Sequence, residues 1–263
     1  MLELYHWEPN TFSLAALIGL NEKALDYKSR YIDWINFEQY AGKGPRLNIE
    51  AECNPEQEGP MLKDGDTLIS DSFFLLEYLD DAYPQNPLKM REAHGDWEVQ
   101  VWGRFLGEQA APAVSSLGGH RYLAPLLKEK QINNAGEILE RMPTQERKAA
   151  WSEAISDSYS EESLSDSRRK AGLMIERIEK ALADGANWLV EDTYTMADIE
   201  AFALANSLPK LLPDVANATA SPKFMAWLER MRARPAVRKA LATSRTGKPD
   251  EAFAPGPEHS RWG

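Results

Sequence analysis

The sequence predicts a mixed α/β domain over residues 1–84, followed by an all-helical domain over residues 85–263. Three observations indicate this division. Strand-like and helix-like segments alternate up to Ala82. A proline-rich linker then interrupts the pattern at residues 84–87. Beyond the linker, apolar residues recur at helical spacing to about Ala242.

The order of elements in the first domain follows from local patterns. Helical spacing of Leu14, Leu17 and Ile18 predicts a helix over residues 13–23. The Asp64-Gly65 pair predicts the tight turn of a hairpin. The other predicted elements are strands at 2–7, 27–32, 61–62 and 67–69 and a helix at 71–82. This order is that of the thioredoxin-like fold, with parallel and antiparallel strands in one sheet.

The second domain is predicted to be helical throughout. Thr195 and Asp198 have the spacing of a capping box, with aspartate in place of glutamate or glutamine. Residues 115–120 interrupt a helix and predict a kink, and the segment from Thr246 predicts a tail wrapped on the surface. The long helices are predicted at 145–156, 164–183 and 196–208, with another from Asp96.

Composition restricts the possible functions. The chain has 263 residues and 29.6 kDa, which is enough for two domains with their own cores. No apolar run approaches the roughly 18 residues that span a bilayer, and no signal peptide is recognised at the start. The single cysteine, Cys53, excludes an internal disulfide framework, and the four histidines show no metal-ligand spacing. A cytoplasmic protein without a metal is therefore expected.

Negative charge is concentrated in the first domain. Residues 1–84 carry a net charge of −10, out of −11 for the whole chain. Such a domain does not favour nucleic acid as a partner, and no membrane partner is expected. It also does not attract an anionic ligand from a distance, so any such ligand must be held by local contacts.

A candidate ligand site lies at residues 54–72. The Gly59-Pro60 bond can be cis, which would turn the Gly59 N–H and C=O toward a ligand. Ser72, at the start of a predicted helix, offers a hydroxyl and a backbone N–H to a carboxylate. Asp71 offers a carboxylate to an ammonium group. Together these groups suit the free amino-acid end of a peptide.

This arrangement resembles the glutathione-binding half of the glutathione transferase superfamily, whose pattern is roughly Asn-Pro-x-Gly-x-Val-Pro-x-Leu and then Glu-Ser. Three further segments are similar to the bacterial β-etherases, which use glutathione to cleave β-aryl ethers derived from lignin; they lie at residues 5–25, 141–151 and 188–206. The resemblance implies glutathione as co-substrate, an aromatic small-molecule substrate, and a homodimer or a heterodimer with a related subunit. It also implies that the box at Thr195 and Asp198 serves folding.

The resemblance implies that Ser13 activates the glutathione thiol. A thiol with a pKa near 8.5 must ionise to act as a nucleophile at neutral pH. A helix N-terminus and the Ser13 hydroxyl would both favour the thiolate. The thiolate would then displace an aryloxy group from the carbon next to a ketone. Two alternatives stay open: Ser13 is only a helix cap, or Tyr5 is the activating residue.

The second substrate is expected near Phe12, Ser115, Ser116 and Tyr122. Some residues depart from the family pattern: Phe12 replaces a frequent asparagine, Glu58 a frequent glutamine or lysine, Gly59 a frequent valine, and Asp71 a glutamate. These departures motivate an alternative hypothesis, that the chain is a non-catalytic subunit that stabilises an active partner. A second alternative is a general detoxifying transferase with a different electrophile.

Overall fold

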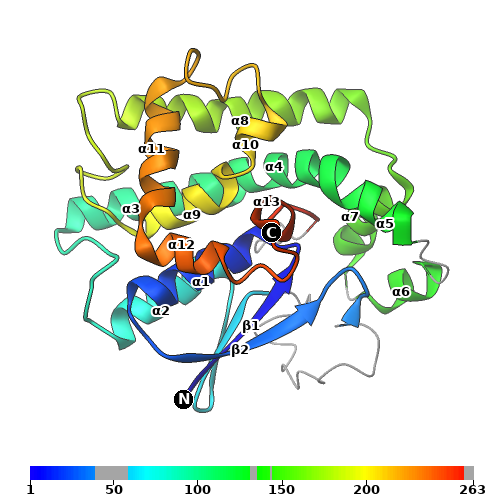
Figure 1. Cartoon of the computed structure of the whole chain (residues 1–263), viewed down its shortest axis with the longest axis horizontal. Helices are drawn as coiled ribbons and strands as arrows, with labels where there is room; N and C mark the ends of the chain where they lie inside the picture. The colour runs from blue at the N-terminus through cyan, green and yellow to red at the C-terminus, as the bar shows by residue number, and fades with distance from the viewer. Residues whose placement is uncertain (39–58, 131–134, 143, 258–263) are drawn as a thin grey trace.

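A computed structural model describes residues 1–38, 59–130, 135–142 and 144–257. It confirms a thioredoxin-like unit joined to a helical unit. In Figure 1 the sheet lies below and the helices of the second unit lie above it, with α1 between them. Within the described ranges, no helix has the length and apolar character needed to cross a membrane.

The sheet has four strands in the order β2-β1-β3-β4. β1 and β2 are parallel, whereas β3 is antiparallel to both β1 and β4. This is the mixed sheet that the sequence predicts. The strands are β1 (Leu2–Glu8), β2 (Tyr27–Asp33), β3 (Met61–Asp64) and β4 (Thr67–Ser70).

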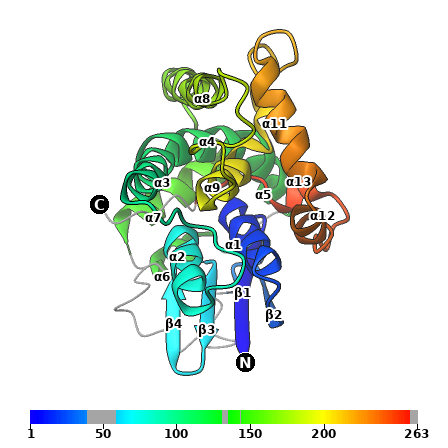
Figure 2. The same cartoon turned by 90° about the vertical axis from the view of Figure 1, so that its left-hand side faces the viewer.

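The two faces of the sheet pack against different partners. Because side chains alternate along a strand, Leu2 and Leu4 of β1 point to one face and Trp7 points to the other. The first face is covered by α1 (Thr11–Glu22) and α2 (Ser72–Ala82), which share its apolar cluster. Figure 2 shows these two helices between the strands and the helices above.

The helical unit begins at α3 (Ala93–Phe105), three residues before the predicted start at Asp96. The predicted interruption at residues 115–120 is confirmed in part: the regular α-helix α4 ends at Gly118 and a π-helical stretch begins at Gly119, but the chain stays helical into α5. The remaining elements are η2 (Leu106–Ala110), α4 (Ala111–Gly118), η3 (Gly119–Leu123), α5 (Ala124–Lys130), α6 (Ala135–Arg141), α7 (Gln145–Ser156), α8 (Glu161–Ala181), α9 (Met196–Ala205), α10 (Leu208–Leu211), α11 (Pro222–Ala233), α12 (Pro235–Leu241) and α13 (Pro249–Ala252).

The larger apolar core runs through both units. It joins Leu4 of β1 and Leu17 of α1 to Phe202 of α9 and Val237 of α12. An ion pair also crosses the boundary: Arg234 donates to both carboxylate oxygens of Glu22 at 2.7 and 2.9 Å. The two units therefore share one core. The domain boundary between residues 84 and 85 stays a prediction from the sequence.

A second, smaller core lies on the other face of the sheet. Trp7 and Met61 pack there with side chains from α5, α6 and α7. Trp151 of α7 makes edge-to-face contacts with Trp34 and Phe37, with ring centroids 5.2 and 4.8 Å apart. Helices α5, α6 and α7 thus pack on this second face of the sheet.

Candidate active site at the end of the sheet

Strand register brings the predicted binding segments together. Met61, the first residue of β3, pairs with Tyr5 of β1 and with Ser70 at the end of β4. The pair at residues 59–60 therefore lies beside the pair at residues 71–72, near the end of β1. The turn from β1 into α1 follows at the same end of the sheet.

Ser13 lies in the first turn of α1 and is fully buried. Its Oγ accepts a hydrogen bond from Trp7 N–H at 3.0 Å, and its own N–H donates to Asn10 Oδ1 at 2.6 Å. The hypothesis that Ser13 caps the helix is wrong, because Asn10 is the N-cap. The helix starts at Thr11, two residues earlier than predicted. Ser13 is left with a hydroxyl hydrogen to donate near the positive end of the helix dipole.

Gly59 and Pro60 are joined by a cis peptide bond, as the sequence allowed. The absence of a side chain at Gly59 has a direct packing reason. A Cβ at this position would meet Trp7 Cη2 at 2.5 Å and two further carbons of the same ring more closely still. The Trp7 ring therefore occupies the space that a valine would use. Glu58 lies outside the described residues.

Asp71 is the N-cap of α2, and its Oδ1 accepts from Phe73 N–H at 2.8 Å and from Phe74 N–H at 3.3 Å. Its backbone φ of 70° is unusual for a residue other than glycine and costs about 1–3 kcal/mol. Next to it, Ser72 Oγ is buried without a hydrogen-bond partner among the described residues. An unpartnered buried hydroxyl fits a ligand carboxylate that would accept from it.

Two buried ionisable residues at the end of β1, His6 and Glu8, have shifted pKa values, and neither was predicted as a site residue. Burial raises the pKa of Glu8, whose carboxylate accepts from Arg245 N–H at 3.2 Å. Burial, and then the positive charge of Arg245, lower the pKa of His6 to about 4. His6 is therefore neutral at physiological pH, and its Nε2 is hydrogen-bonded to Ser29 Oγ at 2.7 Å.

The C-terminal segment is buried, so the prediction of a surface tail is wrong for residues 252–257. Asn10 N–H donates to the carbonyl of Ala252 at 3.0 Å, which places α13 beside the start of α1 (Figure 1). Gly118 of α4 packs so closely on Pro255 that a Cβ would lie 2.7 Å from its Cγ. Buried Arg147 of α7 donates to the carbonyl of Pro257. Residues 252–257 thus contact the start of α1, Gly118 of α4 and Arg147 of α7.

The residues expected near the second substrate lie on three elements. Phe12 is buried in the larger core, next to Ser13 in α1. Ser115 and Ser116 lie inside α4, and Tyr122 lies in η3. The hydroxyls of Ser115 and Tyr122 are buried without partners among the described residues. Burial raises the pKa of the Tyr122 hydroxyl, which keeps it protonated.

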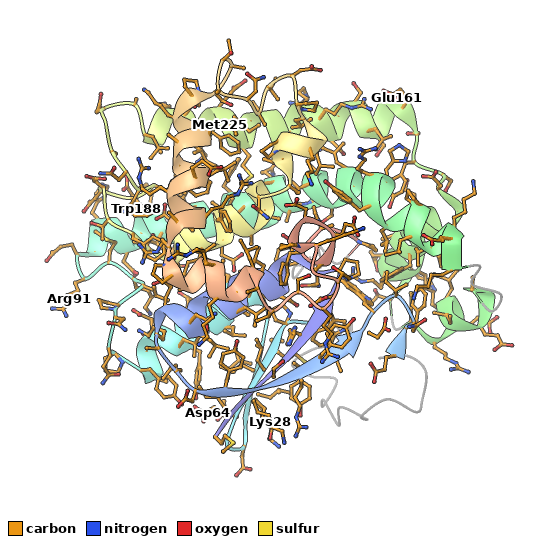
Figure 3. The ribbon with its side chains drawn as sticks, in the orientation of Figure 1. Lys28, Asp64, Arg91, Glu161, Trp188 and Met225 are labelled. Carbon is orange, nitrogen blue, oxygen red and sulfur yellow. The ribbon has the colours of Figure 1, made fainter. Side chains whose placement is uncertain are left out.

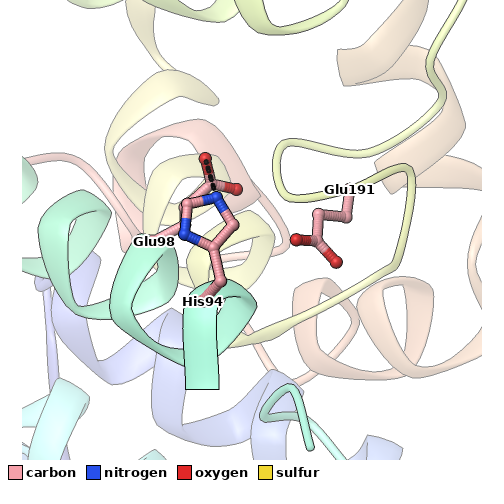
Figure 4. Close-up of side chains that lie close together, drawn as sticks. All are labelled: His94, Glu98 and Glu191. Atoms are coloured by element: carbon pink, nitrogen blue, oxygen red, sulfur yellow. Dashed lines mark ion pairs between the residues drawn. The ribbon is translucent and has the colours of Figure 1, made fainter. Parts of the chain in front are cut away.

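Other clusters lie away from this end of the sheet. Asp64 lies at the opposite end of the sheet (Figure 3). Its carboxylate accepts from the hydroxyls of Tyr78 and Tyr83 at 3.0 and 2.6 Å. His94, Glu98 and Glu191 bring their ligand-type atoms within 4.8 Å of one another (Figure 4). The last three do not belong to the elements that carry Ser13, Asp71 or Ser72.

Comparison with known proteins adds independent evidence. The family model described as "Glutathione S-transferase, N-terminal domain" matches residues 4–87, and the one described as "Glutathione S-transferase, C-terminal domain" matches residues 144–235. The chain is 29% identical to protein LigF of Sphingobium sp. strain SYK-6, covering 93% of this chain and 94% of that protein. It is 31% identical to a zeta-class glutathione S-transferase of Euphorbia esula over 52% of each chain.

Solved structures agree with these matches. The crystal structure of beta-etherase LigF from the same Sphingobium strain superposes with a TM-score of 0.83 at 28% identity, covering 92% of this chain and 99% of that one. Glutathione transferase F7 of Populus trichocarpa, at 21% identity and a TM-score of 0.68, shares the fold. Family models match on both sides of the linker, and LigF aligns over nearly the full length of the chain. Both findings agree with the geometry of the site. The chain therefore belongs to the glutathione S-transferase family and is an enzyme that takes glutathione as its co-substrate.

Proposed function

We propose that this glutathione transferase is a β-etherase, which displaces an aryloxy group from the carbon next to a ketone in lignin-derived aryl ethers. A carbon–sulfur bond forms, the carbon–oxygen bond to the aryl group breaks, and the electron pair leaves with the phenolate. The full-length similarity to LigF, which is described as a beta-etherase, supports this substrate class. The observation that carries the chemistry is the buried Ser13 hydroxyl in the first turn of α1.

In this proposal Ser13 acts on the sulfur of glutathione. Trp7 N–H occupies one lone pair of Ser13 Oγ, and the hydroxyl hydrogen is directed to the thiolate. The N-terminus of α1 adds roughly half a positive charge at the same place. Both favour the charged form of the thiol, so the nucleophile is present at neutral pH.

We propose that the groups at residues 59–60 and 71–72 hold the peptide. The Gly59 and Pro60 backbone would hydrogen-bond to the peptide in the manner of a strand. The buried Ser72 hydroxyl would donate to the α-carboxylate of the γ-glutamyl end, and Asp71 would accept from its ammonium group. The unusual φ of Asp71 supports a binding role, since backbone strain of this kind is concentrated at ligand sites.

Asp71→Asn is expected to weaken glutathione binding by about 1.5–3 kcal/mol, the cost of losing a charge-assisted hydrogen bond. Asparagine still caps α2 and tolerates a positive φ, so the fold should be preserved. Isothermal titration calorimetry measures the affinity. Asp157→Asn is the matched control, because Asp157 also has a positive φ of 49° at a helix end. An unchanged affinity in Asp71→Asn would show that the amino end binds elsewhere.

We propose that the aromatic substrate binds between α1 and α4. Phe12, Ser115, Ser116 and Tyr122 would line this pocket, and the buried segment at residues 252–257 would form one of its walls. The hydroxyls of Ser115 and Tyr122 have no partner among the described residues, which supports their availability to a polar group of the substrate.

We further propose a cytoplasmic dimer, formed with a second copy or with a related subunit. Phe74 of α2 and Trp97 of α3 are 47% and 58% exposed, and large exposed apolar side chains support an interface on these helices. Light scattering on the purified chain should give twice 29.6 kDa for a homodimer. A monomeric mass would favour a partner of different sequence.

The test of the proposed function is incubation of the purified chain with glutathione and a β-aryloxy aryl ketone. Equal amounts of a free phenol and a glutathione thioether are expected. Turnover of general electrophiles without ether cleavage would favour a detoxifying transferase. Loss of both activities, with glutathione still binding, would favour the non-catalytic subunit to which Phe12 and Glu58 point.

A further inference from the structure

Trp7 contacts both halves of the proposed site. Its backbone N–H donates to Ser13 Oγ at 3.0 Å. Its indole ring is fully buried and lies directly against Gly59. One residue therefore touches the hydroxyl that would act on sulfur and the glycine that would bind the peptide backbone.

The hydrogen bond from Trp7 orients the Ser13 hydroxyl. A serine hydroxyl carries one hydrogen and two lone pairs, and a donor on one lone pair limits where the hydrogen can point. Asn10 Oδ1 holds the Ser13 backbone from the other side at 2.6 Å. The exact position of Ser13 Oγ therefore depends on the backbone of Trp7, and a shift of the Trp7 backbone would change the donor's direction.

The ring of Trp7 fixes that backbone. It belongs to the smaller core, whose other buried members include Met61, Trp34 and Trp151. Interiors of this kind are packed as densely as organic crystals, so the ring has no empty space to move into. A methyl group at Gly59 would overlap the ring carbons. Either the ring or the backbone at residues 59–60 would have to shift.

We propose that Trp7 is a positioning residue, and that the glycine at position 59 is required because the Trp7 ring fills the place of its side chain. The pair sets the Ser13 hydroxyl at the distance and angle needed by the sulfur. This inference rests on the proposed role of Ser13. It adds that the departure from valine at this position is compensated by Trp7 and does not mark a defective site.

A double-mutant cycle tests the pair. Gly59→Ala is expected to lower kcat at neutral pH about tenfold or more, and to raise the pH at which bound glutathione ionises, as read from ultraviolet thiolate absorbance. Trp7→Phe removes part of the ring that the methyl would meet, and should lower kcat only about threefold. The double variant should recover to within about threefold of Trp7→Phe, with its ionisation midpoint close to that of the wild type.

Trp34→Leu is the control, because Trp34 lies in the same core without a hydrogen bond to Ser13. It should lower the melting temperature and leave the ionisation midpoint unchanged. The inference is overturned if the two single substitutions multiply in the double variant, or if neither moves the midpoint while the wild type forms the thiolate. If the wild type forms no thiolate, the role of Ser13 fails, and the inference fails with it.

Discussion

Ser13→Ala is expected to lower turnover at neutral pH about ten- to a hundredfold, which corresponds to about 1.5–3 kcal/mol for a charge-assisted hydrogen bond to the thiolate. The N-terminus of α1 remains, so thiolate formation should be reduced but not abolished. The pH at which activity rises should move upward. Affinity for glutathione should change little, because the ends of the peptide are held at Asp71 and Ser72.

The structure allows this experiment to separate chemistry from folding. Asn10, and not Ser13, caps α1, so Ser13→Ala leaves the cap in place. A matched control is Ser160→Ala, since Ser160 Oγ caps α8 by accepting from Ser163 N–H at 3.1 Å. The control should lose stability and keep its rate and pH profile. If Ser13→Ala behaves in the same way as the control, Ser13 does not act on sulfur.

Asp198→Ala is expected to destabilise the fold by at least about 3 kcal/mol, because three buried N–H groups would lose their acceptor. Asp198 is fully buried and accepts from Thr195 N–H at 3.1 Å, from Leu189 N–H at 3.2 Å and from Trp227 Nε1–H at 2.9 Å. Thr195→Ala removes the side-chain acceptor of the first turn of α9, including the bond from Ala197 N–H, and should cost about 0.5–2 kcal/mol. Denaturant unfolding measures both values, and glutathione affinity should be unchanged in folded Thr195→Ala.

The same carboxylate makes stability depend on pH. Burial raises the pKa of Asp198 to about 7, although its hydrogen bonds from Trp227, Thr195 and Leu189 lower it. The folded state therefore binds this proton more tightly than the unfolded state does. The contribution of Asp198 to the free energy of unfolding is greatest below about pH 4 and is lost as pH rises through 7. Asp198→Asn should lack this pH dependence. Curves of stability against pH that run parallel for the wild type and Asp198→Asn would contradict this expectation.

Elements with clear end signals were predictable from the sequence. The bounds of α7 are those expected, because Thr144 caps the helix through its side chain. The capping box of α9 is also confirmed. The start of α1 differs from the prediction, because the apolar spacing of Leu14, Leu17 and Ile18 does not report the cap at Asn10. Local patterns identify the type of an element better than its first residue.

Contacts between distant segments were not predictable. Residues 252–257 carry the proline and glycine of a surface loop, yet they are buried against Gly118 and Arg147. The pairing of Trp7 with Gly59 joins residues far apart in the chain, and no periodicity reports it. The extra bonds of Asp198 to Leu189 and Trp227 are likewise tertiary, which is why its expected effect exceeds that of a helix cap.

The proposed chemistry requires that this chain binds glutathione and holds it as a thiolate. Ultraviolet difference titration of the wild-type protein with glutathione across pH tests it directly. We expect a thiolate signal with a midpoint clearly below the value of about 8.5 for a free thiol, and a higher midpoint in Ser13→Ala. A midpoint equal to that of free glutathione in both proteins, or no binding at millimolar ligand, would contradict it.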